Sequence, residues 1–381
     1  MSDLDQTIKV AVSGCGLRSQ AVIKRLLLDS RGQVEVAAVY DPDRQVVSNA
    51  LSKWEIDSCN ICSSYEEAIH TPQVDWVMIF SPNNCHCQQI LAAFEAKKHV
   101  FSEKPLATTI EDCKLIYDAH QKSSSIFATG FVLRYSRLYR LAKELLDSGK
   151  LGRILSINAD ENIPPPHGAY IMQNWRRHTS IAGPHILEKC CHDLDLLNWF
   201  CGSLPDKVAA FGSLDFFRKE NQSLKQKHPG VFDSGWSDPH SSEADAFASD
   251  KDIIDNQVCI ARYRNGIKVQ FQATMSNVIP ERRMYFSCTE GTMLLDLYKS
   301  TLCYRLAGNK EIHTVDFAAD GHGGGDDNIM SELFDVMQHG GEPKCSGSEG
   351  LESAVFALAL DQAMRENQVI DLEPVWRHLN R

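Results

Sequence analysis

Two short motifs in this chain carry side chains that are suited to moving a proton. In the first, Glu103-Lys104-Pro105, a lysine follows the apolar run His99–Ser102 and precedes a proline, which fixes the turn. A lysine next to a cationic group has a lowered pKa and can then donate or accept a proton. The alternative is a solvated lysine in front of a helix, and the local pattern favours neither.

The second motif is Glu188-Lys-Cys-Cys-His192-Asp-Leu-Asp195. Helical spacing of apolar residues predicts one helix over Leu187–Phe200, which places Glu188 and Asp195 on either side of His192, one turn away. A histidine near a helix N-terminus stays neutral because the helix dipole disfavours its charged form, so His192 is available as a general base. The alternative is a buried histidine that carboxylates hold for packing alone.

A glycine turn near the N-terminus predicts a site for a pyrophosphate. The apolar run Ile8–Ser13 leads into the turn, and helical spacing resumes over Arg18–Ser30. The first glycine permits a tight turn, and the second allows the backbone to approach a pyrophosphate that rests on the helix N-terminus. The alternative is a turn that only caps a structural helix. The predicted contacts are Gly14, Cys15, Gly16, Leu17 and Arg18.

An acid after the second strand indicates which dinucleotide binds there. The run Val34–Tyr40 ends at Asp41, about 20 residues beyond the turn, where a carboxylate bonds the hydroxyls of an adenosine ribose. The same carboxylate repels a 2′-phosphate, so Asp41 favours NAD over NADP. Arg18 and Arg44 lie nearby and offset part of that repulsion, which keeps NADP open as a cofactor.

The elements that must position these residues fall into two patterns. Strand-like and helix-like segments alternate over roughly the first 125 residues, which predicts an α/β domain with a doubly wound parallel sheet. Longer strand-like runs then follow one another, with Asn265-Gly266 as a hairpin signal, so the second part is α+β with a mostly antiparallel sheet. We expect a dinucleotide-binding domain over 1–128 and a substrate-binding domain over 129–381, whose last helix is able to pack back on the first. The polar stretch 218–252 is expected to be a mobile loop.

The composition excludes several classes of protein. The chain has 381 residues and a formal net charge of −11, so it lacks the basic footprint of a nucleic-acid binder. Its longest apolar stretch, Ala354–Leu360, is far shorter than the roughly 20 residues that span a bilayer, and the polar N-terminus shows no secretion signal. Thirteen scattered cysteines, an odd number, indicate a reduced protein of the cytoplasm.

Clusters of cysteine and histidine do not reach a metal-binding pattern. Cys59-Asn-Ile-Cys62 is a single Cys-x-x-Cys pair without a second pair at the required distance. Cys85-His86-Cys87 and Cys190-Cys191-His192 lack a complete set of ligands. We therefore predict buried, reduced thiols and no metal.

Several motifs together resemble the glucose–fructose oxidoreductase, inositol dehydrogenase and MocA (Gfo/Idh/MocA) family, from about Ile8 to about Leu372. The resemblance implies a Rossmann domain with a bound nicotinamide dinucleotide, an open-faced antiparallel sheet and a sugar or cyclitol substrate. It also implies oligomers, a homodimer or homotetramer, formed through the open sheet face. The motifs are Gly14-x-Gly16, Ser81-Pro82-Asn83 with His86, Ser102-Glu-Lys-Pro-Leu106, Gly130-Phe-Val-Leu-Arg-Tyr135, Ser148-Gly-Lys-Leu-Gly152, His192-Asp-Leu-Asp195 with Trp199 and Gly202, and His322-Gly-Gly-Gly-Asp326.

Single residues take roles from the resemblance and from their positions. His192 resembles the family's acid–base histidine, and Glu188 stands where relatives often have aspartate. Further cofactor contacts are expected at Ser81, Pro82, Asn83, His86 and Glu103. Substrate contacts are expected at Arg134, Tyr135, Trp175, Arg176, Glu188, Asp195 and His322. For several of these, a solvated loop or a helix cap is an equal alternative.

These observations lead to one preferred function and two alternatives. The preferred function is an NAD(P)-dependent oxidoreductase of a sugar, cyclitol or sugar derivative, in which Lys104 and His192 manage the hydroxyl proton. One alternative is a redox-neutral enzyme that uses tightly held NAD for transient oxidation, as in glycosidic elimination. The other is a non-catalytic NAD-binding regulator, which the presence of both Lys104 and His192 argues against.

Overall fold

The chain folds into two compact units. The structure is a computed structural model in which residues 7–233, 245–318 and 324–381 are described. The first unit comprises Met1–Val132 and Asp326–Leu351, and the second comprises Leu133–Gly325 and Glu352–Arg381. Each unit therefore combines one long stretch of chain with a shorter segment from nearer the C-terminus.

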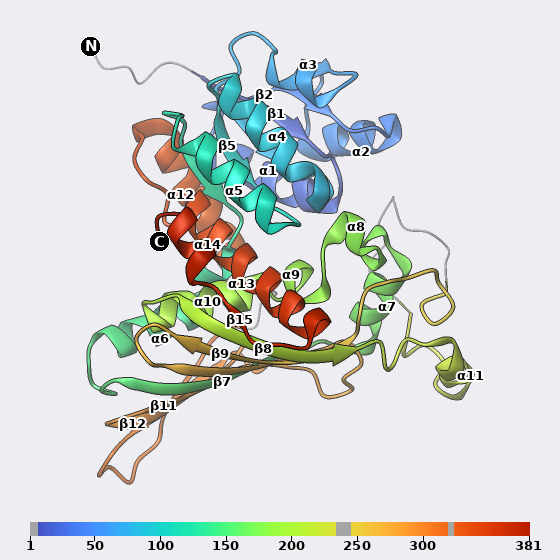
Figure 1. Ribbon diagram of the computed structural model, residues 1–381. Helices are drawn as coiled ribbons and strands as arrows, with labels where there is room; N and C mark the ends of the chain where they lie inside the picture. Colours follow the sequence, from blue (N-terminus) through green and yellow to red (C-terminus); the bar gives the residue numbers. More distant parts are fainter. Residues whose placement is uncertain (1–6, 234–244, 319–323) are drawn as a thin grey trace. The chain divides into compact units, whose positions relative to one another are not determined.

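The first unit is built on a six-stranded parallel sheet with helices on its faces (Figure 1). The strand order is β3-β2-β1-β4-β5-β6, and every neighbouring pair is parallel, as predicted. The order reverses between β1 and β4, and ligands of such sheets bind there, outside the carboxyl ends of the strands. The strands are β1 (Ile8–Ser13), β2 (Val34–Tyr40), β3 (Asn60–Ile61), β4 (Trp76–Ile79), β5 (His99–Ser102) and β6 (Phe127–Thr129).

Helices cover this sheet because its central strands are apolar on both sides. Val10, Val12 and Met78 have no exposed side-chain surface, which is typical of parallel strands packed on both faces. The C-terminal segment joins the unit at its last strand, where the Thr129 amide donates to the Cys345 carbonyl over 2.9 Å. The helices are α1 (Leu17–Ser30), α2 (Arg44–Trp54), α3 (Tyr65–Ile69), α4 (Asn83–Glu95), α5 (Ile110–His120), α12 (Gly325–His339) and the first turn of α13 (Gly347–Glu366).

The second unit is built on a nine-stranded sheet in the order β14-β13-β12-β11-β7-β10-β9-β8-β15. The neighbours β7 and β10 run parallel and the other pairs are antiparallel, which confirms the mostly antiparallel sheet. The predicted hairpin at Asn265-Gly266 joins β9 to β10, and Gly266 has a φ of +85° that favours glycine. The strands are β7 (Ile154–Asn162), β8 (Pro205–Ser213), β9 (Asn256–Tyr263), β10 (Lys268–Thr274), β11 (Glu281–Cys288), β12 (Gly291–Asp296), β13 (Thr301–Leu306), β14 (His313–Asp316) and β15 (Ile370–Asp371).

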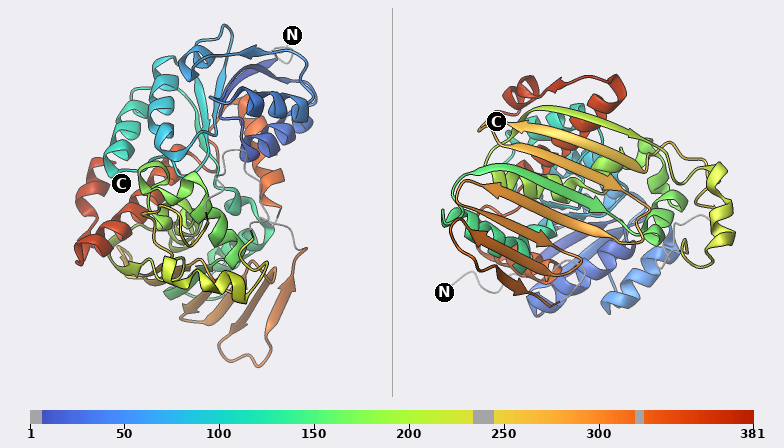
Figure 2. Two further views of the ribbon diagram at one scale, coloured as in Figure 1. Left: turned by 90° about the vertical axis from the view of Figure 1, so that its right-hand side faces the viewer. Right: turned by 90° about the horizontal axis from the view of Figure 1, so that it is seen from below.

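Helices of the second unit lie on one face of its sheet, and the other face is open (Figure 2, right). In the described part of the chain, no helix is long and apolar enough to cross a membrane. The helical elements of this unit include η1 (Val132–Tyr135), α6 (Arg137–Asp147), α7 (Pro165–Gln173), η2 (Trp175–Arg177), α8 (Thr179–Ala182), α9 (His185–Glu188), α10 (Cys191–Cys201), the later turns of α13, and α14 (Glu373–His378).

The segment 218–252, for which the composition predicts a mobile loop, is anchored to the second unit by two buried aromatic residues, while most of 218–230 is exposed. Phe232 and Phe247 are buried against Phe217 in an aromatic cluster, with ring centroids 6.4 and 5.2 Å from that of Phe217. Residues 234–244 of the predicted loop lie outside the described residues. The ordered elements of this segment are η3 (Lys219–Asn221) and α11 (Ser223–Lys227).

Candidate active site

The glycine turn of the first unit lies between β1 and α1 and is shaped for close backbone approach. Gly14 has a φ of +90°, and a Cβ there would lie 2.6 Å from the carbonyl carbon of Phe80, so only glycine fits. Among the described residues, a Cβ on Gly16 would meet nothing within 4 Å, which leaves space beside the N-terminus of α1. A pyrophosphate fits such a place because the amides of the helix N-terminus point at it.

Asp41 is buried at the end of β2 and is bound to the glycine turn. One carboxylate oxygen accepts a hydrogen bond from the Cys15 amide over 2.9 Å, and the other accepts from the Asp43 amide over 3.0 Å. The residue that sequence reasoning assigned to the ribose therefore also fixes the conformation of the turn. A carboxylate at this position fits an adenosine ribose, and the residues present match a nicotinamide dinucleotide of the NAD type.

His86 connects the loop after β4 to the loop after β5. Its ring nitrogens lie 2.8 Å from the Ser81 carbonyl oxygen and 2.7 Å from the Pro105 carbonyl oxygen, and the side chain is buried. Asn83 is also buried, in the first turn of α4. His86 therefore holds two loops at the carboxyl ends of neighbouring strands in fixed positions.

The turn that carries Lys104 follows β5, at the same edge of the sheet as the glycine turn. The Lys104 amide donates to the Glu103 carboxylate over 3.2 Å, and the Lys104–Pro105 peptide bond is cis. The other carboxylate oxygen of Glu103 accepts from Arg18 Nε over 2.6 Å. The predicted cofactor residues of the first unit thus converge on one edge, outside β1, β2, β4 and β5.

In the second unit, the single helix predicted over Leu187–Phe200 is wrong. The chain forms a short α9 that ends at Glu188 and a separate α10 that begins at Cys191. The relation of one helical turn between Glu188 and His192, which assumed a continuous helix, does not apply across this break. The break places Lys189 and Cys190 between the two helices, and Ser353 Oγ fixes the start of α10 by donating to the Cys191 carbonyl over 2.6 Å.

Two predicted substrate residues, Arg134 and Asp195, form an ion pair with each other. Arg134 Nε and Nη2 donate to the two oxygens of Asp195, each over 2.7 Å. Both side chains are largely buried, and the guanidinium carbon lies 5.6 Å from the centre of the Trp199 ring. Arg134 is therefore anchored from η1 to α10, and Tyr135 next to it is buried as well.

A second pair joins Arg176 to Glu188. Arg176 Nε donates to Glu188 Oε1 over 2.7 Å, and Nη1 donates to the Tyr170 hydroxyl over 3.0 Å. The Arg176 guanidinium lies over the Trp175 ring, 4.2 Å from its centre. The structure thus brings together three of the predicted substrate residues, whereas His322 lies outside the described residues.

Sequence reasoning missed a buried charge cluster beneath α10. Arg282 donates to both oxygens of Asp193 and lies 3.3 Å from Glu161, whose carboxylate is 3.9 Å from the Lys189 ammonium. Burial, followed by the charge of Glu161, raises the pKa of Asp193, while Arg282 opposes that rise. The only signal that could have pointed to this cluster is the pairing register of two strands. Glu161 on β7 and Arg282 on β11 are directly opposite each other.

His185 on α9 is a further residue that the sequence did not single out. It is 1% exposed, and neither ring nitrogen has a hydrogen-bond partner in the part of the chain that the structure describes. Burial lowers its pKa to about 4, so the ring is neutral near pH 7. Among the described residues no group of three or more histidine, cysteine or acidic side chains is arranged to hold a metal ion.

Comparisons with known proteins place the two units in one family. Residues 8–131 match the model described as oxidoreductase family, NAD-binding Rossmann fold, and residues 139–294 match the GFO/IDH/MocA C-terminal domain. The protein YteT of Bacillus subtilis is 24% identical over 92% of this chain and 94% of its own length. Inositol 2-dehydrogenase of Salmonella typhimurium is 30% identical over 51% of this chain and 54% of its own.

A solved structure shows the same fold over nearly the full length. Levoglucosan dehydrogenase in complex with NADH and levoglucosan is 20% identical and has a TM-score of 0.82, covering 97% of this chain and 100% of that one. The family models match in order, and together they take in the glycine turn, the Glu-Lys-Pro turn and the segment of His192. The chain therefore belongs to the Gfo/Idh/MocA oxidoreductase family, and its first unit is the family's NAD-binding Rossmann domain.

Proposed function

We propose that this protein is an NAD(P)-dependent oxidoreductase that transfers hydride between nicotinamide and a hydroxyl-bearing carbon of a sugar, cyclitol or sugar derivative. One observation carries the proposal. The turn with Lys104 and the glycine turn lie at the same edge of one parallel sheet, on the strands β5 and β1 that flank β4. This arrangement supports a proton-transferring amine beside the site of a hydride carrier.

The proton is managed by the chain's own residues. When bound, the dinucleotide supplies hydride transfer, and Gly14, Gly16 and Asp41 hold it at the strand ends. Lys104 binds the reacting hydroxyl oxygen at its Nζ, and His192 at the start of α10 takes the hydroxyl proton. In the reverse direction the same groups return that proton to the carbonyl oxygen.

The substrate residues favour an uncharged polyhydroxy compound. Arg176 is paired with Glu188 and Arg134 is paired with Asp195, so both cations are neutralised within the protein. The Trp175 ring beside Arg176 offers a flat apolar surface of the kind that packs against the C–H face of a sugar ring. Paired charges beside such a surface provide hydrogen-bonding groups without a net charge to attract an acid.

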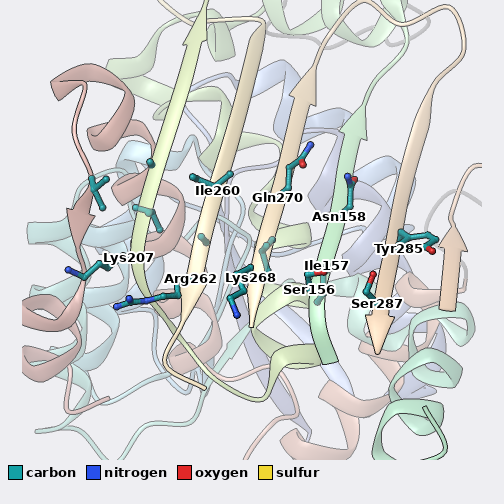
Figure 3. A pocket seen from close by; sticks show the side chains of 15 residues that line it. Ser156, Ile157, Asn158, Lys207, Ile260, Arg262, Lys268, Gln270, Tyr285 and Ser287 are labelled. Atoms are coloured by element: carbon teal, nitrogen blue, oxygen red, sulfur yellow. The ribbon is translucent and has the colours of Figure 1, made fainter. Parts of the chain in front are cut away.

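The open face of the second unit's sheet supports a homo-oligomer, and we propose that two copies associate through it. A groove of about 540 Å³ runs across this face between Lys207 and Tyr285 (Figure 3). Phe211, Val258 and Ile260 expose 72%, 42% and 58% of their surface, which is apolar area that a second copy would cover.

The thirteen cysteines are all free, which supports a reducing compartment such as the cytoplasm.

A substrate panel tests the function. The protein is incubated with myo-inositol, levoglucosan and common aldoses, each with NAD or NADP, and formation of reduced nicotinamide is followed by absorbance. We expect turnover with at least one neutral polyol and a preference for NAD. Consumption of substrate without accumulation of reduced cofactor would indicate the redox-neutral alternative, and NAD binding without any turnover would indicate the regulator.

A further inference from the structure

Arg18 connects three segments of the first unit that are far apart in the sequence. It is the second residue of α1, directly after the glycine turn. Its Nε donates to Glu103 Oε1 over 2.6 Å, and its Nη1 donates to Asp326 Oδ1, at the start of α12, also over 2.6 Å. Burial acts to lower the pKa of Arg18, but the two carboxylates raise it above its usual range, so the residue remains a cation.

The Glu103 carboxylate is enclosed on three sides. Besides Arg18, it contacts the amide of Lys104, which donates to Oε2 over 3.2 Å. It also lies against Gly130, where a Cβ would come within 2.8 Å of Oε2. A side chain at position 130 would push the Glu103 carboxylate from this place. A carboxylate held in this way fixes the backbone of the next residue, which is the proposed catalytic lysine.

We propose that Arg18 is a positioning residue for Lys104, which it holds through the Glu103 carboxylate in a fixed relation to the glycine turn. This inference rests on the proposed function. Hydride and proton transfer must be aligned to about 0.5 Å, and a bridge between the cofactor's turn and the lysine's turn sets that alignment. Nε and Nη1 are both bound to carboxylates, so these two donor atoms of Arg18 form the bridge.

The same helix provides a matched control. Arg25 pairs with Asp29 and with Asp327, each over 3.0 Å, so it also links α1 to α12. Within the described residues its ion pairs do not include Glu103, and its side chain is more exposed than that of Arg18. Arg25→Met therefore removes an equivalent charge from the same helix without releasing the lysine turn.

The first experiment needs no substrate. Hydrogen exchange measured by mass spectrometry reports the protection of the Lys104 amide in a peptide that spans 102–107. We expect Arg18→Met to speed exchange in this peptide about 10-fold or more, and Arg25→Met to leave it unchanged. Glu103→Gln, which keeps Arg18 and Asp326 in place, should speed exchange in the same way. Unchanged exchange in both Arg18→Met and Glu103→Gln would overturn the proposal.

The second experiment separates positioning from binding. With the polyol that gives turnover, Arg18→Met should lower kcat about 10- to 100-fold while the Kd for NAD changes less than about 3-fold. In a Lys104→Met background the same change should have no further effect on kcat, because the residue acts through the lysine. An additive loss, or a parallel loss of NAD affinity, would contradict the proposal. If no polyol is turned over, the proposed function fails, and the exchange result still decides whether Arg18 fixes the turn.

Discussion

Arg282 and Asp193 form a fully buried ion pair in which Nε and Nη2 donate to the two carboxylate oxygens over 2.8 and 2.7 Å. Arg282 lies on β11 directly opposite Glu161 on β7, so the sheet itself places the cation. Asp193 follows His192 in the first turn of α10. The pair therefore fixes the start of that helix, and with it the histidine, to the sheet.

Removing the cation should destabilise the second unit strongly. Arg282→Met leaves Asp193 and Glu161 buried without their main partner, and breaking such a pair costs about 3–5 kcal/mol. Urea denaturation measures the free energy of unfolding. Arg264→Met is the control, because the Arg264–Glu373 pair is exposed and such pairs contribute up to about 1 kcal/mol. Equal losses in the two variants would contradict this account of the cluster.

His185 should make the second unit sensitive to acid. Its pKa falls from 6.5 to about 4 on burial, so the stability that it contributes is fully present above pH 6.5 and is lost as the pH falls toward 4. We expect His185→Leu to lose less stability than the wild type between pH 7.5 and pH 4.5, by about 2–3 kcal/mol at most.

Asp160 changes stability with pH in the opposite direction to His185, so its effect must be accounted for in the same experiment. Burial raises its pKa to about 6, so its contribution is present below pH 3.8 and is lost as the pH rises through 6. Wild type and His185→Leu share this group, and the difference between them isolates the histidine. A difference that does not change with pH would show that His185 is not neutral and buried in solution.

Lys104→Met and His192→Asn should each lower turnover by about 10²- to 10⁴-fold while NAD binding is retained. The reason is that each removes a group that we propose handles the hydroxyl proton, whereas backbone and Asp41 are the groups proposed to hold the dinucleotide. Steady-state kinetics and calorimetric titration with NAD measure the two effects. Lys53→Met, at an exposed position on α2, should behave as the wild type. Full activity in either catalytic variant would remove that residue from the mechanism.

Asp41→Ala should reduce the preference for NAD over NADP and also weaken NAD binding. The first effect follows from the loss of a carboxylate that repels a 2′-phosphate, and the second from the loss of its hydrogen bond to the Cys15 amide. Asp43→Ala is the control, because Asp43 caps α2 by accepting from the Gln45 and Val46 amides. It should lower stability by about 1 kcal/mol and leave the ratio of the two cofactors unchanged.

The features that the sequence predicts correctly are those set by local chemistry. The glycine turn follows from steric need at Gly14, and the parallel sheet follows from the alternation of strands and helices. The break between α9 and α10 was not predictable from apolar spacing, because Ile186, Leu187 and Leu194 are all buried and fit a continuous helix equally well. The strands β12 and β13 are short, and their residues only partly alternate between buried and exposed. The alternation that predicts a strand from the sequence is therefore weak in both.

The pairings of the candidate site lie beyond local reasoning for a different reason. Arg134 with Asp195, and Arg282 with Asp193, join residues that the fold brings together from distant segments. Sequence reasoning identified Arg134 and Asp195 singly and treated each as a substrate contact. It could not show that the two residues neutralise each other, because a contact between them depends on how η1 and α10 pack.

The position of β7 in its sheet has a consequence for how the chain is made. Both neighbours of β7, β10 and β11, are formed by residues more than a hundred positions later. The first unit likewise lacks α12 until the chain has passed residue 339. Contacts this distant slow folding, and domains in general fold as units while the chain is synthesised. Neither unit can be completed on the ribosome before α12 and the later turns of α13 have emerged. The edges of β7 are exposed while more than a hundred further residues are made, so the nascent chain should depend on chaperones to avoid aggregation.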